Sequence, residues 1–154
     1  MATFAEINIA NQVIRVVKGC TQDAVSNGGE GSEEAATHFA TVCPLSDEGV
    51  KWVQTFFSGS QRKRPAGIGG YYNPDLDMFI YPQPYDSWTL DNNGDWKAPV
   101  THPSIGYEEL IGNGSDYRVL GLLWNEENQK WLCEDRDQNN YEWNTESLSW
   151  LAIA

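Results

Sequence analysis

Hydrophobic and polar residues alternate near the start of the chain in a way that predicts a β-hairpin. Ile7 and Ile9 precede the polar stretch Ala10–Gln12, and Val13 and Ile14 follow it. A period of two residues is typical of a strand with one buried face, and a short polar interruption between two such runs predicts a turn. The aromatic and β-branched segment 51–57 (KWVQTFF) predicts a further strand.

One segment has the spacing of a helix. Its apolar positions recur at intervals of three and four residues: Ala36, Phe39, Ala40 and Cys43. Ser32 is a good N-cap residue, acidic residues follow it beside the positive end of the helix dipole, and Pro44 ends the pattern. We therefore predict one short α-helix, Ser32–Cys43, and no other.

A weak internal repeat runs through the rest of the chain. An aromatic residue is followed by Asn, a polar stretch and a second aromatic residue, in Tyr72–Phe79, Trp124–Trp131 and Trp143–Trp150. Ile7–Ile14 is an aliphatic version, and Trp88–Trp96 is slightly longer. Large side chains that face each other across a short turn stabilise a hairpin, by about 0.2–1 kcal/mol per pair. The repeat predicts a mainly β fold of successive aromatic hairpins, with the one short helix near the N-terminus.

Prolines divide the middle of the chain, at positions Pro82, Pro84, Pro99 and Pro103. Proline lacks the N–H that a strand ladder needs, so it lies at edges and bends. We expect Ile80–Tyr85 and Ala98–Ile105 to run extended over a surface, either of the chain's own domain or of a partner.

The stretch Ala66–Val100 resembles a motif of small virion structural proteins of tailed phages that infect marine cyanobacteria. The matching positions are Ala66-Gly67-Ile68-Gly69, Tyr72, Asp77, Phe79-Ile80, Pro82, Pro84-Tyr85, Ser87-Trp88, Leu90, Trp96, Ala98 and Pro99. The opening MATFAEIN and Trp52–Thr55 are also similar to that family, so the likeness covers roughly residues 1–100. It implies a β-rich domain with one helix over residues 1–103. Residues 104–154 then form a C-terminal hairpin region, either separate or part of the same domain.

Charge limits the partners. The 154 residues include 22 acidic and 10 basic ones, which gives a net charge of −12. An acidic surface repels nucleic acid and anionic membranes and favours docking on a basic protein surface. The N-terminus has no basic region followed by an apolar run, so we expect synthesis in the host cytoplasm. Three cysteines predict reduced thiols and leave a Cys20–Cys43 pair open.

The residues that could take part in catalysis or metal binding show no spacing typical of such a site. The two histidines, His38 and His102, belong to no pattern with metal-ligand spacing, and no nucleophile or phosphate-binding motif occurs. Carboxylates such as Glu126 and Glu127 lie in polar turns and are interpreted as solvated surface. We therefore predict no catalytic residue, no metal site and no cofactor.

Two candidate contact sites remain. The first is the extended aromatic–proline segment with a nearby tryptophan, and its candidate subunit-contact residues are Tyr81, Pro82, Pro84, Tyr85, Trp88 and Trp96. The competing interpretation is that Trp88 and Trp96 are core residues of their own hairpin. The second is the positive island Arg62, Lys63 and Arg64, which either contacts an acidic patch on a neighbouring subunit or is a solvated loop.

The leading functional hypothesis is a non-enzymatic structural component of a tailed-phage virion, either a head decoration protein or a small tail- or neck-associated protein. Its partners would be capsid, neck or tail subunits and further copies of itself. A carbohydrate-binding receptor module of a phage tail is the alternative, because exposed Trp and Tyr suit sugar faces. A glycan-degrading enzyme is a third hypothesis.

Overall fold

A computed structural model describes residues 1–103, 122–135 and 138–153, and these residues form a mainly β structure with two short helices. The predicted fold class is therefore confirmed. Internal contacts divide the chain into unit 1, residues 1–83 and 92–95, and unit 2, residues 84–91 and 96–154. The predicted boundary after residue 103 lies at the edge of segment 104–121, which is outside the described residues, so that boundary stays a prediction.

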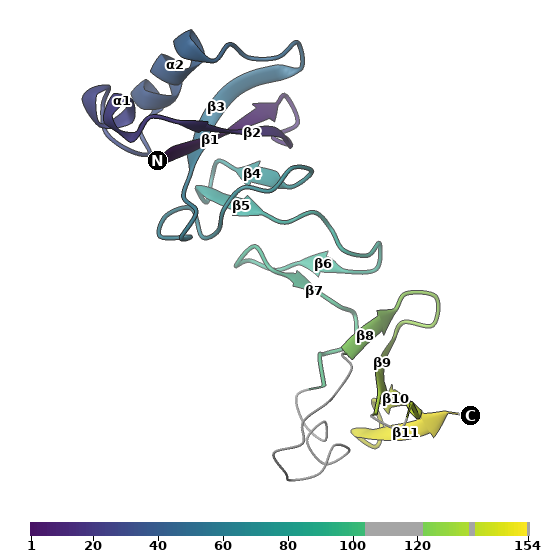
Figure 1. Cartoon of the computed structure of the whole chain (residues 1–154). Coiled ribbons are helices and arrows are strands. Elements are labelled where there is room, and N and C mark those ends of the chain that lie inside the picture. The colour runs from purple at the N-terminus through teal and green to yellow at the C-terminus, as the bar shows by residue number, and fades with distance from the viewer. Residues whose placement is uncertain (104–121, 136–137, 154) are drawn as a thin grey trace. The chain divides into compact units, whose positions relative to one another are not determined.

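Unit 1 contains a three-stranded antiparallel sheet in the order β2–β1–β3, formed by β1 (Ala2–Asn8), β2 (Val13–Gly19) and β3 (Gly49–Thr55) (Figure 1). The predicted first hairpin is confirmed, and the Asn8 side chain accepts hydrogen bonds from two backbone N–H groups of its turn. Ile7 lies opposite Val13 instead of Ile14, because the register shifts at Glu6/Ile7. A β-bulge of this kind adds one residue to one strand of the pair.

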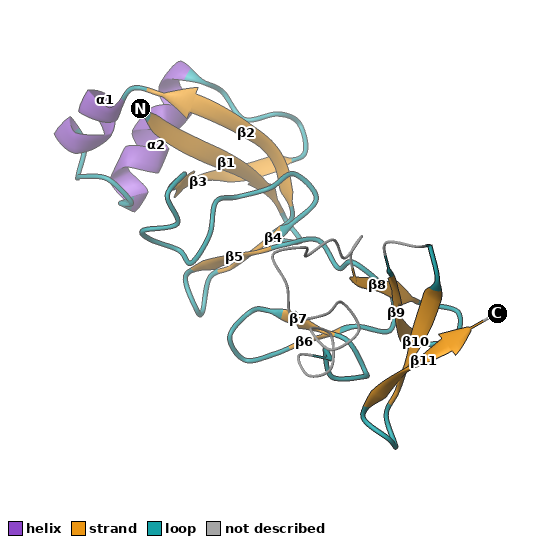
Figure 2. Ribbon diagram, turned by 60° about the horizontal axis from the view of Figure 1, so that its bottom comes forward, coloured by secondary structure: helices purple, strands orange, loops and turns teal. Residues whose placement is uncertain are grey.

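Helices α1 (Thr21–Ser26) and α2 (Glu33–Val42) lie along one face of this sheet (Figure 2). The predicted helix is confirmed, with Ser32 as its N-cap, since the Ser32 hydroxyl accepts a hydrogen bond from the Ala35 N–H at 3.0 Å. The prediction of a single helix was wrong. Helix α1 is only six residues long and buries Ala24 alone, so it leaves no apolar period in the sequence.

Aromatic rings join the helices to the sheet. Phe39 of α2 stacks on Phe4 of β1 with 4.2 Å between ring centroids, and it meets the edge of Trp52 of β3 at 5.0 Å. On the opposite face of β1, Ala5 and Ile7 pack against Tyr72 and Phe79. Strand β1 is therefore covered on both faces.

The residues that cover this second face belong to the hairpin of β4 (Tyr71–Asn73) and β5 (Met78–Ile80). Tyr72 lies opposite Phe79, with 5.2 Å between the ring centroids, as the repeat predicts.

Unit 2 consists of two antiparallel sheets. The first has β6 (Thr89–Leu90) and β7 (Trp96–Lys97). The second has β8 (Leu122–Asn125), β9 (Lys130–Glu134), β10 (Asn140–Asn144) and β11 (Ser149–Ile153) in the order β11–β10–β9–β8.

Tryptophan pairs organise the larger sheet. Trp124 lies opposite Trp131, and Trp143 lies opposite Trp150, with ring centroids 5.2 and 5.3 Å apart. All four side chains are buried in one cluster, which confirms the repeat. The repeat also predicted that Trp88 and Trp96 face each other across a hairpin, and this was wrong. Trp96 lies opposite Leu90, in a ladder of only two residue pairs.

The three hairpins with aromatic pairs share one turn conformation. In each, the Asn that follows the first aromatic residue accepts a backbone N–H with its side-chain oxygen: Asn73, Asn125 and Asn144. Four residues later the backbone adopts a positive φ, of 45° at Asp77, 50° at Gln129 and 49° at Leu148. Asn side chains that bond the backbone in this way favour turns.

A buried carboxylate fastens the end of α2 to the sheet. Glu6 is fully buried and accepts hydrogen bonds from Arg15 Nε at 2.5 Å and from the Ser46 N–H and hydroxyl at 2.5 and 2.8 Å. Arg15 also donates to the carbonyl of Pro44. A Cβ on Gly49 would lie 1.9 Å from Glu6 Oε1, so this position requires glycine. Burial raises the pKa of Glu6, but the bonds from Ser46 and Arg15 outweigh it and hold the pKa below the ordinary 4.5.

Replacing this carboxylate should destabilise the fold in a pH-dependent way. Glu6→Gln is expected to lower the free energy of unfolding at pH 7 by about 2 kcal/mol, because the three hydrogen bonds to this carboxylate lose their charged acceptor. Since the folded pKa is depressed, the wild-type advantage is complete above pH 4.5 and is lost as the pH falls further. Thermal unfolding of both proteins between pH 7 and pH 3 measures this difference. A difference that persists unchanged at pH 3 would contradict the assignment.

Candidate contact surface

The aromatic–proline segment follows β5 without regular secondary structure. Between Ile80 and Thr89 no residue belongs to a strand, and the side chains of Tyr81 and Tyr85 are 51% and 36% exposed. Tyr81 and Pro82 belong to unit 1, whereas Pro84 and Tyr85 belong to unit 2. The chain bends at Pro84 and Tyr85, and Asp86 and Ser87 form a turn closed by a hydrogen bond from the Trp88 N–H to the Tyr85 carbonyl at 3.1 Å, so the expected extended path does not continue to Tyr85. The second segment that was expected to be extended is Ala98–Ile105. Its described part has no strand either, and its last two residues lie outside the described residues.

One carboxylate anchors the unit 2 part of this segment. Glu126, in the turn between β8 and β9, accepts hydrogen bonds from the Ser87 N–H at 2.8 Å, the Ser87 hydroxyl at 2.7 Å and Trp124 Nε1 at 2.7 Å. These bonds from Ser87 and Trp124 lower the pKa of Glu126. The interpretation of Glu126 as solvated surface was therefore wrong. The sequence did not reveal this contact, because Ser87 and Glu126 are 39 residues apart.

The two tryptophans of the predicted contact site are both partly buried. Trp88 meets the edges of Trp124 and Trp131, with ring centroids 6.2 and 5.9 Å apart, and the Tyr85 ring lies tilted by 38° to it at 5.5 Å. Trp88 thus packs against the tryptophan cluster of the larger sheet of unit 2, whereas the competing interpretation placed Trp88 and Trp96 in the core of their own hairpin. Tyr85 lies on the outer side of this contact, and its role in binding stays a prediction.

Unit 2 also contains an aromatic cavity of about 620 Å³. It is lined by Trp88, Trp96, Lys97, Ala98, Val100, Thr101, His102 and Trp131. His102 packs edge-on against Trp131 at 5.0 Å. Indole faces beside a hydroxyl, an imidazole and an ammonium group are suited to bind an organic ligand that has apolar faces and polar edges. Sequence reasoning missed this cavity, because its walls come from segments that are far apart in the chain.

The basic residues Arg62, Lys63 and Arg64 bind groups of unit 1, the unit to which they belong. Arg62 donates from Nε to Asp77 at 2.7 Å, from Nη1 to the Gln54 carbonyl at 2.5 Å and from Nη2 to the Gly31 carbonyl at 2.9 Å. Its side chain is only 11% exposed. Arg62 therefore joins the loop before α2, strand β3 and the β4–β5 hairpin.

The neighbouring basic residues are engaged as well. Lys63 and Arg64 form ion pairs with Asp95 at 2.9 and 2.5 Å, and the Arg64 guanidinium lies 4.6 Å from the centre of the Tyr81 ring. Arg62 and Lys63 both adopt positive φ, of 56° and 64°, which L-residues rarely do. The role of these three residues in binding a neighbouring subunit stays a prediction, but their charge is already paired within unit 1.

Asp77 is a shared acceptor in this region. The Tyr72 hydroxyl donates to the same Oδ1 that Arg62 contacts, at 2.6 Å. Burial, and then the bond to Asp77, raise the pKa of Tyr72 to about 12. Tyr72 therefore stays protonated at neutral pH and acts as a donor within the fold.

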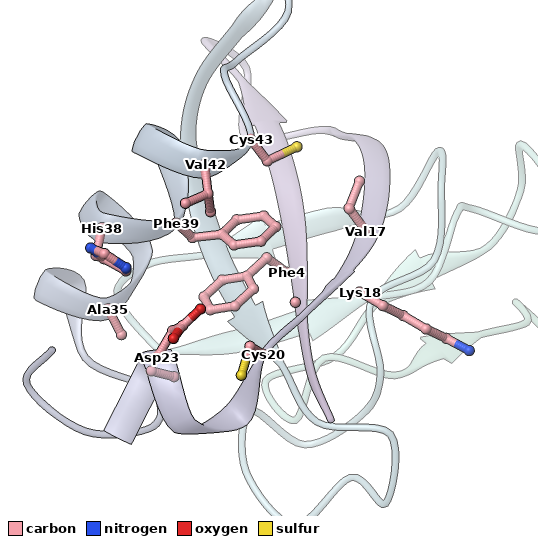
Figure 3. Close-up of a pocket in the computed structure, with 12 residues that line it drawn as sticks. Phe4, Val17, Lys18, Cys20, Asp23, Ala35, His38, Phe39, Val42 and Cys43 are labelled. Atoms are coloured by element: carbon pink, nitrogen blue, oxygen red, sulfur yellow. The ribbon is translucent and has the colours of Figure 1, made fainter. Parts of the chain in front are cut away.

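A smaller pocket of about 250 Å³ opens between the helices and the sheet of unit 1. Figure 3 shows the Phe4 and Phe39 rings at its centre, with Cys20 and Cys43 at opposite ends. All three cysteines are free thiols, so the Cys20–Cys43 pair left open by the sequence is not formed. A Cβ on Gly19 would lie 2.8 Å from the Phe39 ring, so glycine allows this aromatic packing.

Two searches for other kinds of site found nothing in the described ranges. No three or more His, Cys, Asp or Glu side chains gather there in a way that could hold a metal ion. None of the helices found there has the length and apolar character needed to cross a bilayer.

Comparison with known proteins adds no relative: no family model, curated protein or solved structure matches the chain.

Removing the Arg62 side chain's hydrogen bonds should test whether it belongs to the fold. Arg62→Met is expected to lower the free energy of unfolding by about 2–4 kcal/mol, since it leaves the Gln54 and Gly31 carbonyls without this donor and removes one of the two donors to Asp77. Lys97→Met, at a side chain that is 64% exposed, is the control and should change stability by less than about 0.5 kcal/mol. Chemical denaturation measures both. Equal stability of Arg62→Met and wild type would instead favour the contact hypothesis.

Proposed function

We propose that this protein is a non-enzymatic structural component of a tailed-bacteriophage virion, either a head decoration protein or a small tail- or neck-associated protein. It acts through contacts with capsid, neck or tail subunits and is present in several copies. The observation that carries the proposal is the aromatic–proline segment Tyr81–Trp88, which lies outside any strand and is exposed from Tyr81 to Asp86. The resemblance of Ala66–Val100 to small virion proteins gives the class of particle.

The segment has the properties of a binding surface. Its backbone is held in place, because Glu126 fixes Ser87 and the Trp88 ring packs against the buried core. A segment ordered before binding loses less conformational entropy when a partner docks. Tyrosine is enriched among the residues that contribute most to interfaces, and Tyr85 presents part of its ring to solvent.

Charge supports the same type of partner. The net charge of −12 is spread over a surface whose main basic cluster is paired internally. A basic surface on a neighbouring virion protein would attract this acidic chain, and the attraction would weaken with added salt.

Truncating Tyr85 should separate binding from folding. Tyr85→Ala is expected to keep a melting temperature close to wild type, because the ring lies outside the buried core, yet to be lost from purified particles. Quantitative mass spectrometry of gradient-purified virions measures occupancy. Leu148→Ala, another exposed apolar residue of unit 2, is the matched control and should be retained. Full occupancy of Tyr85→Ala, or unfolding of the isolated variant, would refute the role of this segment. Absence of the wild-type protein from virions would refute the proposed function itself.

A carbohydrate-binding receptor module of a phage tail is the second candidate, and the aromatic cavity of unit 2 favours it. Trp88, Trp96 and Trp131 offer indole faces, and Thr101, His102 and Lys97 offer hydrogen-bonding groups beside them. Sugars present C–H faces and hydroxyl edges, which matches this combination.

Glycan-array binding by the full chain tests this second candidate. Trp96→Ala should abolish binding with little loss of stability, since Trp96 is only partly buried, while Tyr85→Ala should bind as wild type does. A wild-type chain that binds no glycan contradicts the candidate. Cleavage of a host polysaccharide in the same assay would favour a glycan-degrading enzyme.

A further inference from the structure

We infer that the groove between α2 and the β4–β5 hairpin of unit 1 binds an extended segment of a partner protein, which adds to the edge of β3 as a further strand. The segment carries alternating apolar residues and a carboxylate. This inference rests on the proposed function and deepens it, because it names the chemistry of one partner and the surface that binds it.

Strand β3 is an edge of the three-stranded sheet. It pairs with β1 on one side, and no other described strand pairs with it. Alternate residues of an antiparallel strand direct both their N–H and their C=O away from the partner strand. The Gln54 carbonyl accepts a hydrogen bond from Arg62, which lies outside the sheet, so Gln54, Trp52 and Val50 form this outward set.

The outward backbone groups of Val50 and Trp52 have no partner of their own. In the part of the chain that the structure describes, no hydrogen bond reaches the backbone of either residue from outside the ladder. Trp52 is only 3% exposed, and a backbone group left unpaired with so little access to solvent is unfavourable. An added strand would supply the missing hydrogen bonds.

A groove follows this edge. It consists of two pockets of about 280 and 220 Å³, which share the lining residues Glu33, Ala36, Lys51 and Trp52. Helix α2 forms one wall, and Tyr72, Pro74 and Asp77 of the β4–β5 hairpin form the other wall of the larger pocket. When a strand adds to a sheet edge, its backbone gives affinity and pockets for its alternate side chains give specificity.

The wall on the α2 side selects apolar side chains. The smaller pocket is lined there by Ala40, Leu45 and Val50. Residues opposite each other in a ladder share a face of the sheet, and Trp52 faces α2, where it meets Phe39. The residues of the segment that lie opposite Val50 and Trp52 therefore face α2 and are the apolar ones.

The other side of the segment meets a positive charge. Lys51 points to the hairpin side, since its Nζ lies 5.6 Å from the centre of the Tyr72 ring, and it forms no ion pair with a described carboxylate. Asp77 is already paired with Arg62, and Glu33 belongs to the opposite wall. A carboxylate on the segment would pair with Lys51. Strand β3 of a second copy has no carboxylate, so it lacks the complementary charge.

The test is fluorescence anisotropy of the full chain with two labelled peptides, Val-Ser-Val-Glu-Val-Ser-Val and the same peptide with a central lysine. Wild type is expected to bind the glutamate peptide about fivefold more tightly, the range of exposed ion pairs. Lys51→Glu, at an exposed side chain, should reverse this preference. Near-ultraviolet circular dichroism checks that the variant is folded.

A second pair of variants tests the groove itself. Thr37→Trp fills the smaller pocket from an exposed position of α2 and should weaken binding of the glutamate peptide at least tenfold. Thr41→Trp makes the same change in the same helix at an exposed residue that lines neither pocket, and should leave the dissociation constant within about twofold.

Backbone methylation of the peptide tests strand addition without changing the protein. Only alternate N–H groups of an added strand point to β3, and these belong to the residues opposite Val50 and Trp52. Methylating the valine nitrogens of the glutamate peptide should therefore abolish binding, whereas methylating the other nitrogens should preserve it. Adding the unmodified peptide should slow hydrogen exchange at Val50 and Trp52 but not in β2, the other edge of the sheet.

Four results would overturn the inference: no peptide binding by wild type up to about 1 mM, the range of weak contacts; an equal effect of the two tryptophan variants; an equal effect of the two methylation patterns; or a charge preference that Lys51→Glu leaves unchanged. Dimerisation that protects Trp52 without peptide would assign the groove to a second copy and also overturn it. A chain that binds no peptide but is found in virions would leave the proposed function intact.

Discussion

The pairing of two aromatic side chains across an asparagine-initiated turn is the interaction on which most of this structure depends. It occurs at Tyr72–Phe79, Trp124–Trp131 and Trp143–Trp150, in both units. A short two-stranded hairpin is marginally stable in water, and each strand here has only three to five residues. Each aromatic side chain buries a large apolar area, so even short hairpins can form a hydrophobic core. The turn is also specified locally, because Asn bonds the backbone at the same point each time.

Long-range polar contacts then connect elements that the hairpins alone would leave separate. Glu6 holds the segment after α2 against the sheet, and Arg62 joins the loop before α2 to β3 and to the β4–β5 hairpin. In unit 2, Glu126 holds the aromatic–proline segment by Ser87. A buried or partly buried charge is stable only when it is hydrogen-bonded, so each of these residues depends on a distant partner. Their removal would therefore loosen connections and not merely delete a surface charge.

These internal uses of charge shape the surface that partners meet. Arg62, Lys63 and Arg64 are paired with acidic groups of their own unit, so the proposed contacts depend on an acidic exterior and on Tyr85.

The local elements could be predicted from the amino-acid pattern, because their causes lie within a few residues. The hairpins follow from the aromatic spacing and the Asn turns, and the Ser32–Cys43 helix follows from its apolar period and its cap. Helix α1 was missed because six residues with one buried side chain show no period. Contacts between residues that are distant in the sequence were not predictable in this way: Trp88 packs on Trp131, Glu126 binds Ser87, Arg62 bonds the Gly31 carbonyl, and three tryptophans line one cavity. Such contacts depend on how elements distant in sequence pack together, and local spacing carries no record of that packing.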